Sequence, residues 1–175
     1  MRKWRFVFLA ALAVAAAQVN ADSAAPFELP DSASGTFVQR KTLADVEVTI
    51  TSSGTFRFVK GRSFVWNTLK PLPSTFSATP DSYTFTADGK STTRKLSELK
   101  MPEEMRSLVK GDFSGLADVF DVKKETGGLA VFVPKTRELR DFVKRFTLAG
   151  GDFPTRFTLD YANGDRLEIE LAKDR

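Results

Sequence analysis

The residue types that most often carry catalysis or bind metal are missing from this chain. None of its 175 residues is histidine or cysteine, which removes the commonest general base, thiolate nucleophiles, disulfides and the usual zinc ligands. No serine lies in a nucleophile motif such as G-x-S-x-G. The sequence therefore does not favour an enzyme, and we expect neither a metal site nor a cofactor.

Two carboxylate pairs are the remaining candidates for acid–base chemistry. Glu103 and Glu104 are neighbours in sequence and would diverge on a helix, whereas Asp118 and Asp121 lie three residues apart and could share a helical face. Nothing beside either pair supplies a nucleophile or completes a set of metal ligands. We interpret all four carboxylates as solvated surface groups.

Basic residues flank a predicted turn and a predicted helical segment. We interpret them as solvated charges, with guidance of an anionic head group as the alternative. They are Lys60, Arg62, Arg94, Lys95 and Lys100.

The first 21 residues have the pattern of a secretory signal. Arg2, Lys3 and Arg5 form a positive region, an apolar run follows, and small residues precede Asp22. The run is too short to span a bilayer comfortably, although a retained anchor is the alternative. Removal of residues 1–21 lowers the formal net charge from +4 to +1, so no nucleic-acid partner is expected. We expect a signal peptide at 1–21, a flexible leader at 22–33 and one domain at 34–175.

The rest of the chain is organised around an aromatic hairpin at residues 53–71. Phe56 and Phe58 alternate in its first run, and Phe64 and Trp66 alternate in its second, with a glycine-containing basic turn between them. Because side chains alternate across a strand, the aromatic rings gather on one face of a sheet. That face must be covered or filled.

Further alternating runs predict more antiparallel strands on both sides of this hairpin. Val46, Val48 and Ile50 predict a half-buried strand that turns at 52–54 into the hairpin. Later runs at 75–78 and 83–87 continue the meander, and 129–133 is an apolar strand closed by Pro134. Residues 136–146 predict a helical turn followed by a strand, and 155–161 and 167–171 predict a hairpin about Asn163-Gly164.

Helical spacing appears between these strands. Apolar residues at 96–109, with Pro102 in the first turn and Gly111 at the end, predict one helix, and 114–120 predicts a second. The pattern as a whole indicates a mainly β (α+β) domain in which one curved antiparallel sheet carries a helical patch over one face.

Phenylalanine dominates the apolar composition. Fourteen of the sixteen phenylalanines lie outside residues 1–21. Their large rings without polar atoms suit either a dry core between helix and sheet or a pocket for an aliphatic ligand. Composition alone leaves both interpretations open.

A resemblance to a known family rests on segments in a fixed order. These segments are GTFVQRKTL, SGTFRF, FVWNTLKP, LVKGDFSGLADVFDV, LAVFVPK and FTLAGGDFPTRFTLDYANGDRLEIEL, within residues 34–171. Together with the export signal, they resemble the LolA-like outer-membrane lipoprotein carriers, in particular a divergent periplasmic branch.

This resemblance implies an unclosed β-barrel with a short helical lid over a hydrophobic cavity that receives acyl chains. It implies a monomeric periplasmic chaperone that transports cargo from an inner-membrane exporter to an outer-membrane acceptor. In the family, an arginine ahead of the F-x-W segment helps to hold the lid shut, and Arg62 is the candidate here, although no proline follows it. The cargo is a lipoprotein, or equally a free lipid or acylated metabolite.

We expect the acyl cavity to be lined from the sheet and from the lid. The sheet-side residues are Phe37, Val48, Ile50, Phe56, Phe58, Phe64, Trp66, Phe76 and Phe85, and the lid-side residues are Leu108, Leu116 and Phe120. The alternative function is a periplasmic interaction module that docks on an inner-membrane lipid-export complex without transporting anything. A cavity of several hundred cubic ångströms favours transport, whereas a solid core favours docking.

Overall fold

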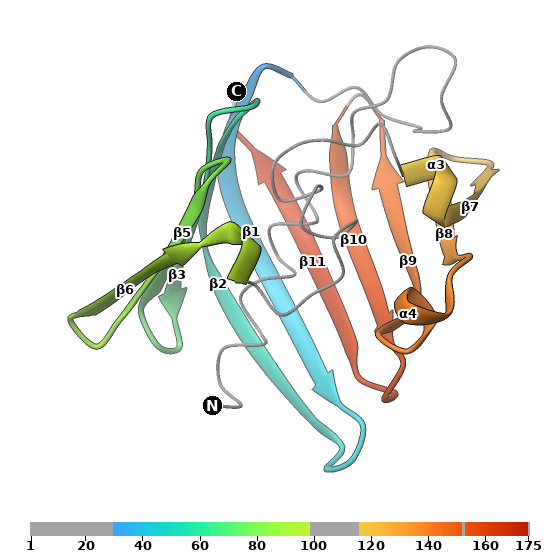
Figure 1. Ribbon diagram of the computed structural model, residues 1–175, viewed down its shortest axis with the longest axis horizontal. Coiled ribbons are helices and arrows are strands. Elements are labelled where there is room, and N and C mark those ends of the chain that lie inside the picture. The colour runs from blue at the N-terminus through green and yellow to red at the C-terminus, as the bar shows by residue number, and fades with distance from the viewer. Residues whose placement is uncertain (1–29, 99–115, 152, 175) are drawn as a thin grey trace.

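The computed structural model describes residues 30–98, 116–151 and 153–174. Within them, eleven strands form one antiparallel sheet in the order β6-β5-β4-β3-β2-β1-β11-β10-β9-β8-β7 (Figure 1). The first six strands are β1 (Ser32–Leu43), β2 (Val48–Val59), β3 (Ser63–Lys70), β4 (Ser74–Ala78), β5 (Ser82–Ala87) and β6 (Lys90–Lys95). The other five are β7 (Phe120–Glu125), β8 (Leu129–Pro134), β9 (Val143–Gly150), β10 (Pro154–Tyr161) and β11 (Arg166–Lys173).

The sheet consists of two meanders that meet at its centre. Every neighbouring pair of strands is consecutive in sequence except β1 and β11, which pair from Gly35–Lys173 to Thr42–Arg166. Strand β1 begins at Ser32, so the last two residues of the expected leader belong to the sheet. The ends of the described chain therefore lie beside each other in the middle of the sheet.

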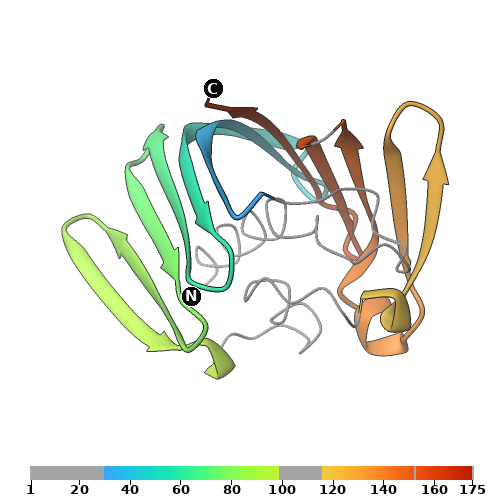
Figure 2. The ribbon, with the colours of Figure 1, turned by 90° about the horizontal axis from the view of Figure 1, so that it is seen from above.

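The sheet curves into a trough and does not close. Figure 2 shows the β5–β6 hairpin on one side of this trough and the β7–β8 hairpin on the other. Strands β6 and β7 are the two edges. The predicted fold class, a mainly β chain forming an unclosed barrel, is confirmed.

Helices contribute little to the described residues. The helical elements are η2 (Leu96–Glu98), α3 (Leu116–Val119) and α4 (Arg137–Arg140). The chain from η2 to α3 connects the two edge strands of the sheet. Most of the predicted helical lid, including Leu108, lies outside the described residues.

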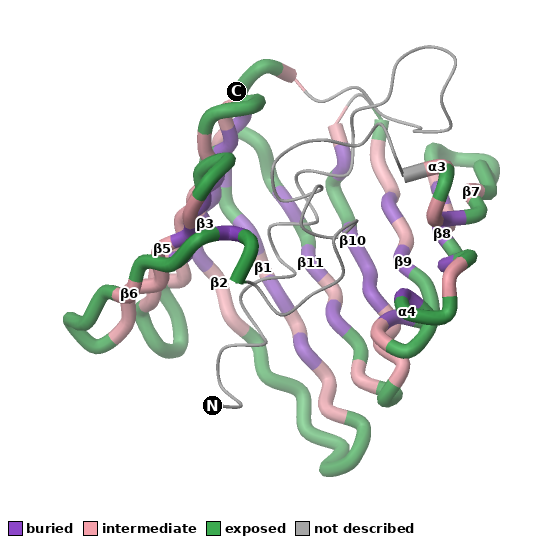
Figure 3. Tube along the Cα trace, in the orientation of Figure 1, coloured by how far each residue is buried: buried purple, intermediate pink, exposed green. Residues whose placement is uncertain are grey.

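Burial alternates along the strands, as Figure 3 shows. In β1 the odd-numbered residues from Ala33 to Lys41 are buried, and in β11 the buried residues are Leu167, Ile169 and Leu171. We call this side the inner face of the sheet. It carries the hydrophobic core.

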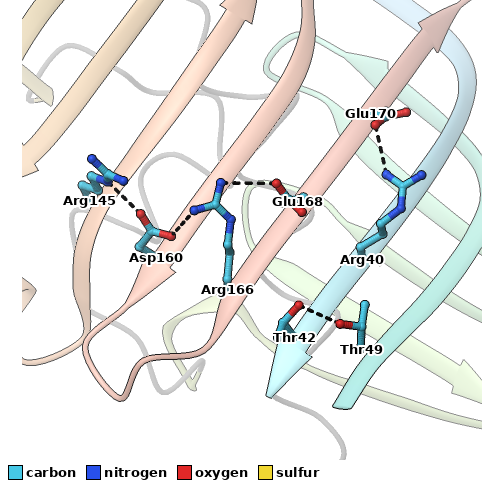
Figure 4. A network of polar contacts seen from close by, with 8 residues as sticks. All are labelled: Arg40, Thr42, Thr49, Arg145, Asp160, Arg166, Glu168 and Glu170. Atoms are coloured by element: carbon cyan, nitrogen blue, oxygen red, sulfur yellow. Dashed lines mark hydrogen bonds and ion pairs between the residues drawn. The ribbon is translucent and has the colours of Figure 1, made fainter. Parts of the chain in front are cut away.

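The outer face is polar. Ion pairs cross from β9 to β1 on this side, together with a hydrogen bond between the hydroxyls of Thr42 and Thr49 (Figure 4). The nitrogen–oxygen distances are 2.7 Å for Arg145–Asp160, 3.2 Å for Arg166–Asp160, 3.3 Å for Arg166–Glu168 and 3.0 Å for Arg40–Glu170. Exposed pairs of this kind stabilise a fold only slightly. Because charged and polar residues occupy the outer face, the apolar side chains of these strands gather on the inner face.

The predicted turn at 52–54 is wrong, because β2 runs straight through these residues. A Cβ on Gly54 would lie 1.9 Å from the carbonyl oxygen of Asn67 on β3. The glycine is needed for this close approach of two backbones, beside a register shift between Ser53 and Gly54, and not for a turn. The actual turn lies earlier, between β1 and β2.

The predicted half-burial at 46–50 is also wrong. Val46, Val48 and Ile50 are all exposed. They lie at the end of the β1–β2 hairpin, which extends beyond the other strands in Figure 1. Their alternation marks a strand, but this end of it has no neighbouring core.

Several local predictions are confirmed. Helix α4 followed by β9, strand β8 ending at Pro134, and the β10–β11 hairpin all occur where the sequence predicts them. The hairpin connection at 162–165 is longer than the two-residue turn predicted, and Gly164 has a φ of 90° there. Strands β6 and β7 were not predicted, and both are short edge strands.

Candidate functional site

One half of the inner face is covered by rings from β1 to β5. We call Phe37, Phe56, Phe64, Trp66, Phe76 and Tyr83 the first aromatic cluster. The rings of Phe37 and Trp66 stack with their centroids 3.7 Å apart, and Phe64 lies 6.0 Å from Trp66. Phe76 extends the contacts to Tyr83 at 6.0 Å. All six rings are buried, so they form a continuous part of the hydrophobic core.

Two glycines make this stacking possible. Phe37 pairs with Gly54 across β1 and β2, so no side chain on β2 separates its ring from Trp66 on β3. Gly35 pairs with Phe56, and a Cβ on Gly35 would lie 2.9 Å from a ring atom of Phe56. Rings that lie over glycines of a neighbouring strand fill the space that a side chain would occupy.

The other half of the inner face carries a second aromatic cluster, which we define as Phe120, Phe132, Phe146 and Phe157. Phe132 and Phe146 stack at 4.2 Å, and Phe120 meets Phe146 edge to face at 5.1 Å. The prediction that Phe120 lies on the lid side is therefore wrong. Phe120 is the first residue of β7 and pairs with Pro134 on β8, so it belongs to the sheet.

A pocket of about 170 Å³ lies at one end of the inner face. Its rim is apolar and open to solvent, since Ile50 is 43% exposed and Leu72 is 76% exposed. Its wall includes Trp66 of the first aromatic cluster, so the pocket is continuous with the apolar inner face. The lining residues are Gln39, Lys41, Ile50, Ser52, Trp66, Thr68, Pro71, Leu72 and Ser74.

In the polar part of the pocket, Lys41 forms an ion pair that has little exposure to solvent. The Lys41 ammonium lies 3.1 Å from the Asp165 carboxylate, with side-chain exposures of only 5% and 12%. The same ammonium lies 3.4 Å from the ring centroid of Tyr161, a cation–π contact. The charge of Lys41 is therefore compensated from within the protein.

Asp165 connects the β10–β11 turn to the β1–β2 turn. Burial alone would raise the pKa of its carboxyl, but hydrogen bonds from the Ala44 N–H, Lys41 and Asn163, together with the charge of Lys41, outweigh burial. The pKa of Asp165 consequently lies below its ordinary value of 3.8. The carboxylate stays ionised at neutral pH and holds the Lys41 end of the pocket in place.

A comparison with known protein families shows the family to which this chain belongs. The sequence matches the family described as outer membrane lipoprotein carrier protein LolA over residues 30–173. The chain belongs to the LolA family. The match covers every strand of the sheet, so the pocket and both aromatic clusters lie within the part shared with the LolA family.

The solved structures that match this LolA-family chain share little sequence with it. One is a LolA superfamily protein from Nitrosomonas europaea, with 9% identity, coverage of 83% of this chain and 86% of that one, and a TM-score of 0.49. Another is an outer membrane lipoprotein-sorting protein domain from Vibrio parahaemolyticus, with 9% identity, coverage of 84% and 86%, and a TM-score of 0.43.

A third similar structure is the MucA/MucB complex of Pseudomonas aeruginosa, with 14% identity, coverage of 96% of this chain and 56% of that one, and a TM-score of 0.38. A comparison with curated protein sequences finds no match for this LolA-family chain.

The structure divides the residues predicted to line an acyl cavity into separate groups. Among those that the structure describes, only Ile50 and Trp66 line the pocket. Phe37, Phe56, Phe58, Phe64 and Phe76 are buried on the inner face, and Phe85 packs against them partly buried. Val48 is exposed and does not line the pocket, Leu116 begins α3, and Leu108 lies outside the described residues. The pocket is smaller than the several hundred cubic ångströms expected of an acyl cavity.

The predicted lid residue, Arg62, lies in the exposed turn between β2 and β3. It borders a much smaller pocket of about 10 Å³, with Phe58 and Phe64 beside it. This space is about one water molecule in size. The role of Arg62 in holding a lid shut stays a prediction.

Sequence reasoning missed Gln39 and Lys41. Both follow Phe37 on the same face of β1, two and four residues later, so the alternation itself would have placed them on the inner face. Their polar side chains give no hydrophobic signal, so apolar patterning alone does not mark them as lining residues.

Other chemistry is sparse in the described part of the chain. No group of three or more histidine, cysteine, aspartate or glutamate residues there is arranged to hold a metal ion. None of its helices is long and apolar enough to cross a membrane. On β5, burial raises the pKa of the Tyr83 phenol, partly offset by Arg94, so Tyr83 remains protonated at neutral pH.

Proposed function

We propose that this protein is a periplasmic carrier that binds the acyl chains of a lipoprotein or lipid and shuttles this cargo between the inner and outer membranes. A cleaved signal peptide at residues 1–21 exports it. An inner-membrane exporter donates the cargo and an outer-membrane acceptor receives it. The carrier works as a monomer, and transfer requires neither catalysis nor a cofactor.

The observation that carries this proposal is the pocket beside Trp66 in a chain of the LolA family. The pocket has an exposed apolar rim at Ile50 and Leu72 and a wall that continues into the first aromatic cluster. An aliphatic chain that enters at the rim therefore has apolar contacts at Ile50, Leu72 and Trp66, beside the polar residues of the pocket.

The size of the pocket shapes the mechanism. A cavity of roughly 150 Å³ holds about one benzene ring, so this pocket accommodates only the beginning of a long acyl chain. The rest of the chain displaces side chains that pack on the inner face. Burial of each methylene contributes about 0.8 kcal/mol, and displacement and association costs offset much of the total. A balance of this kind suits a carrier that must also release its cargo.

Native mass spectrometry of protein purified from the periplasm tests the proposal. We expect adducts with the masses of acylated molecules, or one added acyl probe per chain. A folded sample that shows neither a native adduct nor probe binding would contradict transport.

A second function is favoured by one specific observation. The inner face is largely filled by the rings of the protein itself, as expected of a docking module with a solid core. Under this alternative the chain binds an inner-membrane lipid-export complex through its surface. The mass spectrometry experiment separates the two, since a docking module purifies without acyl adducts.

A further inference from the structure

Gln39 has a buried polar atom that nothing in the described structure satisfies. The side chain lines the pocket beside Trp66, and the residue is 9% exposed. Its Oε1 atom is itself buried and has no hydrogen-bond partner among the residues that the structure describes. A buried acceptor without a donor is costly, so such a group indicates either a bound water or a ligand that supplies the donor.

The surroundings of Gln39 favour a neutral donor over an anionic head group. Lys41 is the cation of the pocket, and its ammonium is already engaged by Asp165 at 3.1 Å and by the Tyr161 ring at 3.4 Å. An anion would gain little from this compensated charge, and it would be repelled by the Gln39 oxygen. A neutral N–H or O–H group instead gains a hydrogen bond in a site with little access to water.

The same pocket joins this polar spot to an apolar path. Trp66 lies on one side, and the exposed Ile50 and Leu72 lie at the rim. A ligand that fits both parts is amphiphilic, with a hydrogen-bond donor directly attached to an aliphatic chain.

We infer that this pocket recognises the neutral linkage at the head of an acyl or alkyl chain, with the buried Gln39 side chain turning towards the ligand so that its Oε1 accepts a hydrogen bond from the N–H or O–H group of that linkage. The inference rests on the proposed function and deepens it, because it names the chemistry that distinguishes one acyl cargo from another. Amide-linked chains and chains that end in a hydroxyl carry the donor. Simple esters do not.

Matched aliphatic probes test this inference in the protein purified from the periplasm. N-methyldodecanamide carries the N–H donor, methyl dodecanoate is nearly the same shape without it, and dodecanol carries a hydroxyl donor. Dissociation constants are measured by competition against a fluorescent fatty acyl probe. We expect the amide to bind about tenfold more tightly than the ester, the size of one buried hydrogen bond. The dodecanol arm shows whether a hydroxyl serves as well as an amide.

The variant Gln39→Leu should bind the amide and the ester equally. Removal of an unsatisfied buried acceptor does not oppose folding, and Gln39→Met is a second variant should Leu not fit. The matched control is Arg40→Gln, a change at the next residue of β1 on the opposite face, which should keep the wild-type preference. Thermal unfolding of each variant confirms that the folded protein is being compared.

The outcomes separate this inference from the proposed function. If wild-type protein binds amide and ester equally, or if Gln39→Leu keeps the preference, the role of Gln39 is refuted while acyl binding stands. If no probe binds to the folded protein, the proposed function fails and this inference fails with it. A preference for the donor probes that disappears only in the Gln39 variants supports both.

Discussion

Ile50 and Leu72 are the residues at which the proposed ligand path reaches solvent. Both line the pocket and both are exposed, so their side chains are available to a ligand without supporting the core. We expect the double variant Ile50→Ser and Leu72→Ser to weaken binding of a dodecyl chain by about tenfold, because apolar area at the rim is lost. Stability should change by less than about 0.5 kcal/mol. Competition binding and urea unfolding measure the two effects.

The control for this experiment is Val46→Ser. Val46 is also an exposed apolar residue of the β1–β2 hairpin, but it does not line the pocket. Its replacement should leave binding unchanged. Equal losses in both variants would show that the whole hairpin end contacts the ligand and that the pocket is not the specific site.

The contribution of Asp165 to the stability of the fold should depend on pH. Its pKa is lowered in the folded protein, so the unfolded chain binds the proton more readily, and the stabilisation is fully present above the ordinary pKa of 3.8. It is lost as the pH falls through the still lower folded-state value. Asp165→Asn should therefore cost about 2 kcal/mol at pH 7. The difference from wild type should shrink when urea unfolding is repeated below pH 3.8. A difference that stays constant with pH would mean that the ionised carboxylate, with its contacts to Ala44 and Lys41, is not its source.

Only some of the residues that line the pocket could be predicted from the sequence. Trp66 and Ile50 are predictable from their apolar side chains, whereas Gln39 and Lys41 are marked only by their alternation in register with Phe37. No sequence pattern tells whether rings fill an interior or surround a space, because this depends on contacts between strands that are far apart in sequence. The stacking of Phe37 on Trp66 over Gly54 is such a contact.

Among the elements, β2 is the one on which the inner face depends most. It pairs with β1 over twelve residues, and Gly54 allows both the approach of β3 and the stacking of rings from β1 and β3. We expect Gly54→Ala to destabilise the fold by about 3 kcal/mol, since its Cβ would lie 1.9 Å from the Asn67 carbonyl oxygen. Thermal or urea unfolding measures this cost.

Gly151→Ala is the matched control for that substitution. A Cβ at Gly151 meets nothing within 4 Å, so its stability should remain within about 0.5 kcal/mol of wild type. If Gly54→Ala were equally neutral, the close approach of β2 and β3 would not be a constraint on this fold.

Local patterns predicted the elements whose signals are local. The α4–β9 succession and the β10–β11 hairpin combine clear periodicity with nearby capping or turn residues. Strand β6, with the sequence KSTTRK, has no apolar face to alternate, so periodicity could not reveal it. The turn wrongly predicted at 52–54 shows the converse, since serine and glycine there serve a close backbone contact in the middle of a long strand.

The molecule as a whole joins two meanders through β1 and β11 into one trough. The polar outer face of the trough and the apolar inner face divide its surfaces by chemistry, and the pocket is where the inner face reaches solvent. This arrangement supports a carrier whose binding surface is continuous and whose entrance is small. It requires that an acyl chain contact Trp66.

Trp66 provides the most direct measurement of that claim. Trp4 is the only other tryptophan, and it lies within the signal peptide proposed to be cleaved, so in the mature protein all tryptophan fluorescence reports on the pocket wall. Titration with a dodecanoyl chain that carries bromine, which quenches tryptophan fluorescence on contact, should give saturable quenching with one chain bound per protein. The unbrominated chain should compete with it. Unquenched fluorescence from folded protein at saturating concentrations of the brominated chain would contradict the account.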